Sequence, residues 1–166
     1  MQPFLHHAGR EYFALRLDQP RAFSLPFAAC PYPVLIWDGL GGWSEHERSG
    51  LLHAVLDTDC RYAVCGGVGC EQWHDDLDQV FIMRYLDDES ARESHFLMTT
   101  WHTGQSPEEV AFYFAHSADS ERDDFTRFLI VHVGTDAGLA ARLEAALTLA
   151  VLDPERFVNE YPEPAG

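Results

Sequence analysis

The sequence contains no lysine, so arginine alone supplies its positive side chains. Eleven arginines stand against 27 aspartates and glutamates in 166 residues, which gives a formal net charge of −16. Such a surface repels phosphate backbones and anionic headgroups, so we expect neither nucleic acid nor a membrane among its partners. A basic protein would be attracted and would associate quickly. The charge could also serve only solubility, and composition leaves both explanations open.

The sequence also lacks a long apolar segment and a rich set of cysteines. No apolar run approaches the roughly 18 residues that cross a bilayer, and the N-terminal segment lacks the charged-then-apolar order of a signal peptide, so we expect a cytoplasmic protein. Four cysteines are too few for a disulfide scaffold in a chain of this length. Cys60, Cys65 and Cys70 have the spacing C-x4-C-x4-C, which differs from the closer pairs of structural zinc sites. The sequence therefore predicts no metal and no cofactor.

Apolar residues make up 46% of the chain, enough for a full core. We expect a single α/β domain over residues 1–166, with an irregular lead-in at 1–32, a core at 33–152, and a helical turn and tail at 153–166. Within the lead-in, Tyr12–Leu17 alternates between apolar and polar residues. This pattern predicts an edge strand or a segment that covers the rim of a sheet.

Four short apolar runs predict strands that are buried on both faces. A helix signal follows each run. Ser44 with Glu47 and Ser106 with Glu109 have the spacing of capping boxes, which start helices directly after each serine. The expected strands are Val34–Trp37, Arg61–Cys65, Phe96–Thr100 and Phe128–Val133, and the expected helices begin near Glu45, Cys70, Pro107 and Ala137.

This alternation of strand and helix predicts a mainly parallel sheet of four to five strands with right-handed crossovers. Helices on both faces would make a three-layer, doubly wound fold of the Rossmann-like or flavodoxin-like kind. Phe81–Leu86 fits either the end of a helix or a separate short strand. Asp87–Glu93 is expected to be an acidic loop.

In open parallel sheets, ligands bind beyond the carboxyl ends of the strands. This rule brings two acids, two thiols, two imidazoles and an indole to one edge of the expected sheet. A small enzyme or a ligand-binding domain would have its site there. The catalytic candidates are Asp38, Cys65, Cys70, His74 and His102, and Trp101 and Asp136 follow strand ends on the same edge.

Three kinds of chemistry were compared at this edge. The segment from Gly67 to Gln72 begins like the dinucleotide motif G-x-G-x-x-G, but Gln72 replaces the third glycine and nearby acids oppose a pyrophosphate. Cys70 near a helix N-terminus favours a thiolate, and His74 lies one turn later, although a cysteine without a role is the simpler explanation. A metal site built from Asp38, His74, Asp75 and His102 lacks a close ligand pair.

A docking surface is the fourth interpretation of the same edge. Tryptophan is enriched at binding hot spots, and an acidic rim around several indoles would suit a basic partner. The alternative is that these large aromatic residues are core. The candidates for partner binding are Trp37, Glu71, Trp73, Asp75, Asp76 and Trp101.

Two segments resemble a family of bacterial α/β domains to which no activity is assigned. They are Cys70-x-x-Trp73-His74-Asp75 and the run MTTWH at 98–102, followed by Glu108-Glu109-Val110. The similarity covers about Pro33 to Ala145. It implies a bacterial, stand-alone α/β domain and assigns no catalytic residue.

The leading hypothesis is an acidic protein without catalysis of its own that acts by binding a basic protein partner. Immunity proteins that neutralise toxins, and accessory proteins of bacterial conflict systems, share this size and charge. The alternative is a small enzyme or small-ligand-binding domain at the carboxyl ends of the strands. The sequence does not indicate the partner, the substrate, the strand order or the oligomeric state.

Overall fold

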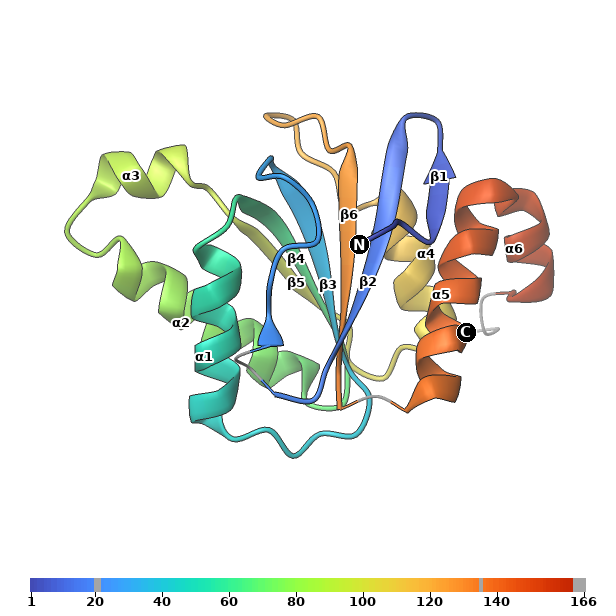
Figure 1. The fold of residues 1–166 in the computed structure, drawn as a ribbon, viewed down its shortest axis with the longest axis horizontal. Helices are drawn as coiled ribbons and strands as arrows, with labels where there is room; N and C mark the ends of the chain where they lie inside the picture. The colour runs from blue at the N-terminus through green and yellow to red at the C-terminus, as the bar shows by residue number, and fades with distance from the viewer. Residues whose placement is uncertain (20–21, 135, 163–166) are drawn as a thin grey trace.

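The computed structural model describes residues 1–19, 22–134 and 136–162. Within them the chain forms a mixed α/β fold around a six-stranded sheet (Figure 1). The strands lie in the order β1-β2-β6-β3-β4-β5, and every neighbouring pair is parallel except β1 with β2. The strands are β1 Leu5–His7, β2 Arg10–Leu17, β3 Tyr32–Asp38, β4 Cys60–Gly67, β5 Met98–Trp101 and β6 Arg127–Val133. The helices are α1 Glu45–Leu56, α2 Cys70–Arg84, α3 Glu89–Ser94, α4 Pro107–His116, α5 Ala137–Leu152 and α6 Pro154–Glu160.

The mainly parallel sheet is confirmed, but the expected count of four to five strands is too low. The N-terminal 32 residues supply two strands, because β1 and β2 form an antiparallel hairpin. β2 is not an edge strand or a rim cover, since it lies inside the sheet between β1 and β6. Its alternating pattern was misleading because Tyr12 and Phe13 are both buried, one on each face.

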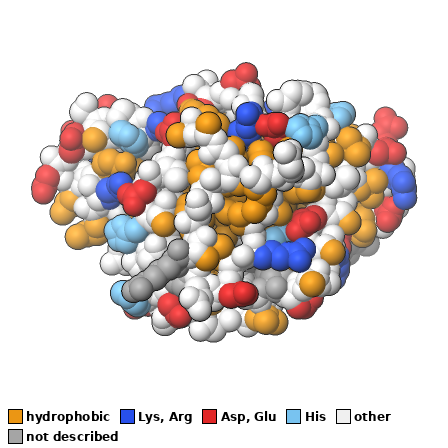
Figure 2. Space-filling view, in the orientation of Figure 1, with side chains coloured by type: hydrophobic (Ala, Val, Ile, Leu, Met, Phe, Trp, Pro, Cys, Tyr) orange, Lys and Arg blue, Asp and Glu red, His pale blue; other side chains and the backbone are white. Residues whose placement is uncertain are grey.

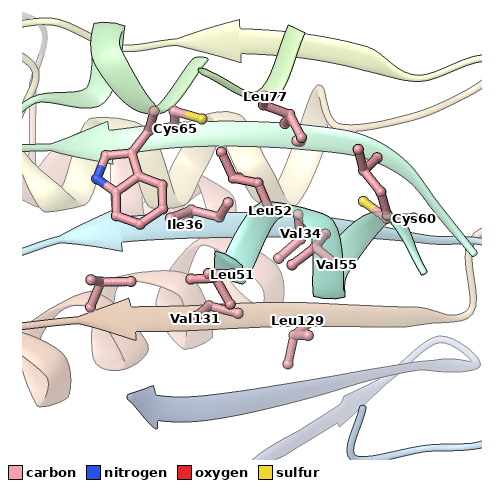
Figure 3. Close-up of a cluster of buried hydrophobic side chains, with 14 of the residues drawn as sticks. Val34, Ile36, Leu51, Leu52, Val55, Cys60, Cys65, Leu77, Leu129 and Val131 are labelled. Atoms are coloured by element: carbon pink, nitrogen blue, oxygen red, sulfur yellow. The ribbon is translucent and has the colours of Figure 1, made fainter. Parts of the chain in front are cut away.

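Helices cover both faces of the sheet (Figure 1). On one face α1 and α2 pack over β3 and its neighbours, and Val34, Ile36 and Leu51 lie in the same buried cluster (Figure 3). On the other face α4 and α5 enclose a second cluster that includes Leu35 and Phe114. Each fully buried side chain of this size stabilises the fold by about 1.5–3 kcal/mol. β3 is buried along its whole length, which explains its continuous apolar sequence.

The described part of the connector between β2 and β3 packs against these two strands. Phe27 lies against Phe13 of β2, with ring centroids 4.9 Å apart, and against Tyr32 of β3 at 5.3 Å. Figure 2 shows apolar side chains gathered in the middle of the face in view, over the region of β2 and β6, with charged groups around them. Among the described residues, no helix has the length and apolar character needed to span a membrane.

The helix starts follow the sequence closely. Both capping boxes are present, at Ser44 with Glu47 and at Ser106 with Glu109. α2 continues to Arg84, so a separate strand in this region is wrong. The expected acidic loop at Asp87–Glu93 is also wrong in part, because α3 begins there. Its start is fixed by the side chain of Asp88, which accepts a hydrogen bond from the backbone N–H of Ala91 at 2.9 Å.

The carboxyl ends of the parallel strands meet at one edge of the sheet, as predicted. Asp38 at the end of β3 is in register with Gly67 of β4 and with Val133 of β6. Cys65 of β4 is in register with Trp101 of β5. The residues that follow these strands therefore lie along a common rim.

The two glycines that end β4 let this strand approach β3 closely. Gly67 has a positive φ of 83°, and a Cβ atom added there would lie 2.0 Å from the backbone oxygen of Asp38. A Cβ at Gly66 would meet the ring of Trp37 at 2.7 Å. Packing between the two strands therefore accounts for these glycines without any bound phosphate.

We expect Gly67→Ala to lower the free energy of unfolding by about 3 kcal/mol or more. Two costs add up: the left-handed backbone is unfavourable for alanine, and the added Cβ collides with a backbone oxygen. Gly9→Ala is the matched control, since Gly9 has nearly the same φ, 80°, with nothing within 4 Å of the added Cβ. It should cost only about 1–2 kcal/mol. Urea unfolding followed by tryptophan fluorescence measures both, and equal losses would contradict the close approach of β3 and β4.

Candidate functional site

The carboxylate of Asp38 is buried at the rim and is held by three donors. Its Oδ1 accepts hydrogen bonds from the backbone N–H groups of Gly41, at 2.7 Å, and of Leu40, at 3.3 Å. Its Oδ2 accepts the indole N–H of Trp73 at 3.0 Å. These contacts shape the turn after β3 and tie it to α2. They favour a structural role over the catalytic role considered for Asp38.

The thiols near the rim are buried away from solvent. Cys65 is completely buried and Cys70 is 3% exposed. Burial raises the pKa of Cys60 to about 12 and raises the pKa of Cys65 even further, so both thiols stay protonated at neutral pH. Cys70 at the start of α2 has its Sγ 3.6 Å from Thr103 Oγ1. The protonated thiol of Cys65 is a poor nucleophile and burial encloses Cys70, so this environment argues against thiol catalysis.

His74 contacts a carboxylate and an indole rather than Cys70. Its ring lies against that of Trp101, with centroids 4.4 Å apart. Its Nδ1 lies 3.0 Å from Asp75 Oδ1, and its Nε2 lies 3.6 Å from Asp78 Oδ2. Trp101 remains 49% exposed. The structure therefore brings an indole, an imidazole and two carboxylates together on one surface of β5 and α2.

Asp78 is a member of this surface that the sequence analysis missed. Its Oδ1 also accepts a hydrogen bond from the hydroxyl of Thr99 at 2.8 Å, which connects α2 to β5. The available signal was its position one helical turn after His74. Thr99 and Trp101 alternate with Met98 and Thr100 along the strand, so the first pair faces α2.

His102 belongs to a separate polar network on the opposite side of β5. Its Nδ1 lies 2.8 Å from Gln105 Oε1, its Nε2 lies 3.3 Å from Thr100 Oγ1, and its ring lies 4.4 Å from that of Tyr113. The hydroxyls of Tyr113 and Tyr62 are 2.8 Å apart. Burial lowers the pKa of His102, so its imidazole is neutral at pH 7. Gln105, Tyr113 and Tyr62 were absent from the predicted site.

The predicted tryptophan cluster does not form. Trp37 packs in the core between the sheet and α4 and α5. Trp73 of α2 packs in the core on the opposite face of the sheet, together with residues of α1. Trp101 alone of the three is exposed. Trp37 and Trp73 are therefore core residues, as the alternative interpretation held.

The acidic candidates on α2 differ in their exposure and in their contacts. Glu71 and Asp75 are exposed. Asp76 is largely covered and forms an ion pair with Arg48 of α1, with Nε and Oδ2 2.6 Å apart. Asp136 is the N-cap of α5, where its side chain accepts the backbone N–H of Leu139 at 2.9 Å.

Over the described residues, no three His, Cys, Asp or Glu side chains come together in a group that could hold a metal ion. Of the four residues weighed as metal ligands, His74 and Asp75 contact each other, whereas Asp38 and His102 lie in other networks. A buried His132 was also missed by the sequence analysis. Its Nε2 lies 3.1 Å from Glu144 Oε1 of α5, and its buried Nδ1 has no hydrogen-bond partner among the described residues. The only signal for His132 was an imidazole inside an otherwise apolar strand.

We expect Asp38→Asn to lower the free energy of unfolding by about 2–3 kcal/mol, because the amide NH2 would face a buried donor. Asp136→Asn is the matched control at a neighbouring strand end. It should change stability by less than about 0.5 kcal/mol, since asparagine caps helices as well as aspartate does. Urea unfolding measures both changes. A stable Asp38→Asn protein would show that its carboxylate is free for another role.

We also expect the four thiols to differ in alkylation by iodoacetamide at pH 8. Cys30 is partly exposed, whereas the other three are buried. Burial also raises the pKa of Cys30, so its reaction should be slower than that of a free thiol. Cys60 and Cys65 should react more than about tenfold more slowly than Cys30 until the protein is unfolded. Mass spectrometry of the peptides follows each site, and fast labelling of Cys65 or Cys70 in the folded protein would revive thiol catalysis.

Comparison with known proteins places the chain in a family. The family model described as "Domain of unknown function (DUF7684)" matches residues 11–150, which include all but the first residue of β2, the strands β3 to β6, the helices α1 to α4 and most of α5. No curated protein and no solved structure matches the chain. The matched residues include the whole surface around Trp101 and the network around His102. Because the match covers most of its length, the chain belongs to the family described as Domain of unknown function (DUF7684).

Proposed function

We propose that the protein acts by binding a basic protein partner at the β5 edge of its sheet. The proposed docking surface consists of β5 and the adjoining side of α2, with Trp101 at its centre. The observation that carries the proposal is the exposed indole of Trp101 on an edge strand, packed against His74, whose ring nitrogens lie close to the carboxylates of Asp75 and Asp78.

β5 is the last strand of the sheet and has a strand neighbour on one side only. Its outer backbone groups have no strand to pair with among the described residues. An extended segment of another protein could add to such an edge through backbone hydrogen bonds. β5 has four residues, which is enough for a short pairing.

The side chains around this edge combine apolar anchors with negative charge. Trp101 is 49% exposed on the side of β5 that faces α2, and Met98 is 44% exposed on its other side, whereas the large apolar side chains of the core are at most 9% exposed. Glu71, Asp75 and Asp78 lie on the first three turns of α2, and Asp75 and Asp78 contact His74, whose ring packs against Trp101. An exposed aromatic anchor within a rim of one charge sign suits a partner with apolar and basic residues.

Catalysis at the strand ends has less support. Asp38 is held by three donors, the thiols are enclosed, and His74 and His102 lie in separate networks on either side of β5. A catalytic site needs its acid, base and nucleophile within reach of one another. Partner binding needs only the surface around Trp101.

We further propose that the fold is a Rossmann-like, three-layer arrangement in which partner binding uses an edge rather than the strand ends. The size and charge of the chain agree with an immunity-type protein or an accessory protein of a bacterial conflict system that works in the cytoplasm. Composition and analogy support this setting.

The test is comparative enrichment of partners from the cells that make the protein, followed by binding measurements with the purified partner. We expect the wild type to retain a basic protein that Glu71→Arg/Asp75→Arg and Trp101→Ala lose. With the purified pair, each change should weaken binding by about tenfold or more. The charge-reversed variant should also lose most of the salt dependence of the association rate.

The matched control is Glu45→Arg/Glu155→Arg. It makes the same change in net charge at exposed residues in the first turns of α1 and α6, away from β5. Its binding should stay within about twofold of the wild type, since a distant charge acts only through the weak overall field. Equal losses of binding in the control and test variants would show that only the net charge matters and not its place on the surface. An acidic partner, or one retained equally by all variants, would refute the proposed surface.

A further inference from the structure

A cavity of about 670 Å³ lies between α4 and α6, apart from the surface around Trp101. This volume falls within the roughly 300–1,000 Å³ that is typical of small-molecule sites. Four aromatic side chains and two carboxylates are the distinctive part of its lining. They are Phe112, Tyr113, Phe157 and Tyr161, with Glu109 and Glu160.

The aromatic side chains that line the cavity are held in place by contacts with one another and with residues behind them. The ring of Tyr113 is fixed by the ring of His102 at 4.4 Å and by the hydrogen bond between its hydroxyl and that of Tyr62 at 2.8 Å. On the α6 side, Phe157 stacks on Phe112, with centroids 5.0 Å apart. Tyr161 continues the wall, 5.0 Å from Phe157. Walls that are already ordered lose little entropy when a ligand binds.

The charge in the cavity is negative. Glu109 is fixed by the N-terminus of α4, where its Oε2 accepts the backbone N–H of Ser106 at 2.7 Å. Glu160 lies on α6, and its one ion pair in the described structure is to Arg156, a 67% exposed side chain 3.5 Å away. None of the described lining residues is basic. Burial lowers the pKa of His102, so the imidazole behind Tyr113 adds no positive charge at neutral pH.

Aromatic walls and carboxylates together select one class of ligand. A cation over aromatic rings is attracted by their quadrupoles, and carboxylates at the entrance add a longer-range attraction. An anion would be repelled by the same groups. A small hard metal ion is a poor fit, since it needs a close shell of oxygen ligands that two carboxylates on different helices do not provide.

We propose that the cavity between α4 and α6 binds a small organic cation of the substituted ammonium class, held by aromatic contacts and by the carboxylates of Glu109 and Glu160. This site is separate from the β5 edge and does not depend on the proposed partner. A quaternary ammonium group is the best match because its apolar methyl groups fit aromatic walls while its charge meets the carboxylates.

The experiment is an NMR titration of the full chain with choline and, separately, with 3,3-dimethyl-1-butanol, which has the same shape without the charge. We expect saturable shifts with choline at residues of α4 and α6, and binding of the neutral alcohol that is weaker by about tenfold or more. Equal binding of both probes would leave an apolar pocket with no preference for cations and would overturn the proposal. Absence of saturable choline binding would overturn it as well.

The matched variants are Glu109→Gln and Glu47→Gln. Each residue is the third residue of a helix in a capping box, and glutamine keeps that role, so both proteins should fold and lose one charge. Glu109→Gln should weaken choline binding by about threefold or more, whereas Glu47→Gln should leave it unchanged, since Glu47 is not in the cavity. Tyr161→Leu should also weaken it. Equal effects of the two glutamine variants would contradict the site.

Glu71→Arg/Asp75→Arg separates this site from the proposed function. Choline binding should be unchanged in this variant, because its substitutions lie on α2 and not on α4 or α6. A loss of choline binding there would place the cation outside the cavity and overturn the proposal. The two proposals can therefore fail independently.

Discussion

The hydrogen bonds to the carboxylate of Asp38 are the constraint on which the rim of the sheet depends. They join the turn after β3, through Gly41 and Leu40, to the indole of Trp73 on α2. The backbone oxygen of the same residue accepts the N–H of Val68, and this requires the glycine beside it. One residue thus sets the distance between β3, β4 and α2. Because α2 carries His74 and Asp78, it also sets where they meet β5.

This arrangement separates two kinds of surface that the sequence places close together. Residues 65–78 include buried thiols, a buried indole and exposed carboxylates close together in the sequence. The strand ends are mostly filled by groups that hold the fold. The exposed side chains that could bind a partner or a ligand lie away from the strand ends. They are at Trp101 on the edge strand and in the cavity between α4 and α6. Both places are negatively charged, in keeping with a chain that has no lysine.

Local signals predicted the central part of the fold well, because they depend on neighbouring residues. The capping box at Ser106, the apolar run of β3 and the meeting of the strand ends are confirmed. The β1–β2 hairpin is local, since it turns at Ala8-Gly9, where both residues have a positive φ, and this turn signal was missed. The position of β2 inside the sheet depends on long-range pairing with β6, which no local pattern encodes. The site was predicted in part. Asp38 and Cys65 were correctly placed at the rim, but their burial follows from the packing of α2 and could not be deduced from strand ends alone.

The two margins of the sheet are unequal, and this limits how assemblies can grow. One edge of the sheet is β1, which has only three residues before the hairpin turn. The other edge is β5, which carries an exposed aromatic anchor. Continuous polymers made by strand addition need two usable margins on every subunit. With one usable margin, strand addition ends after a single event. Under the proposed binding at β5, strand addition would give a closed, one-to-one complex and not an extending fibre.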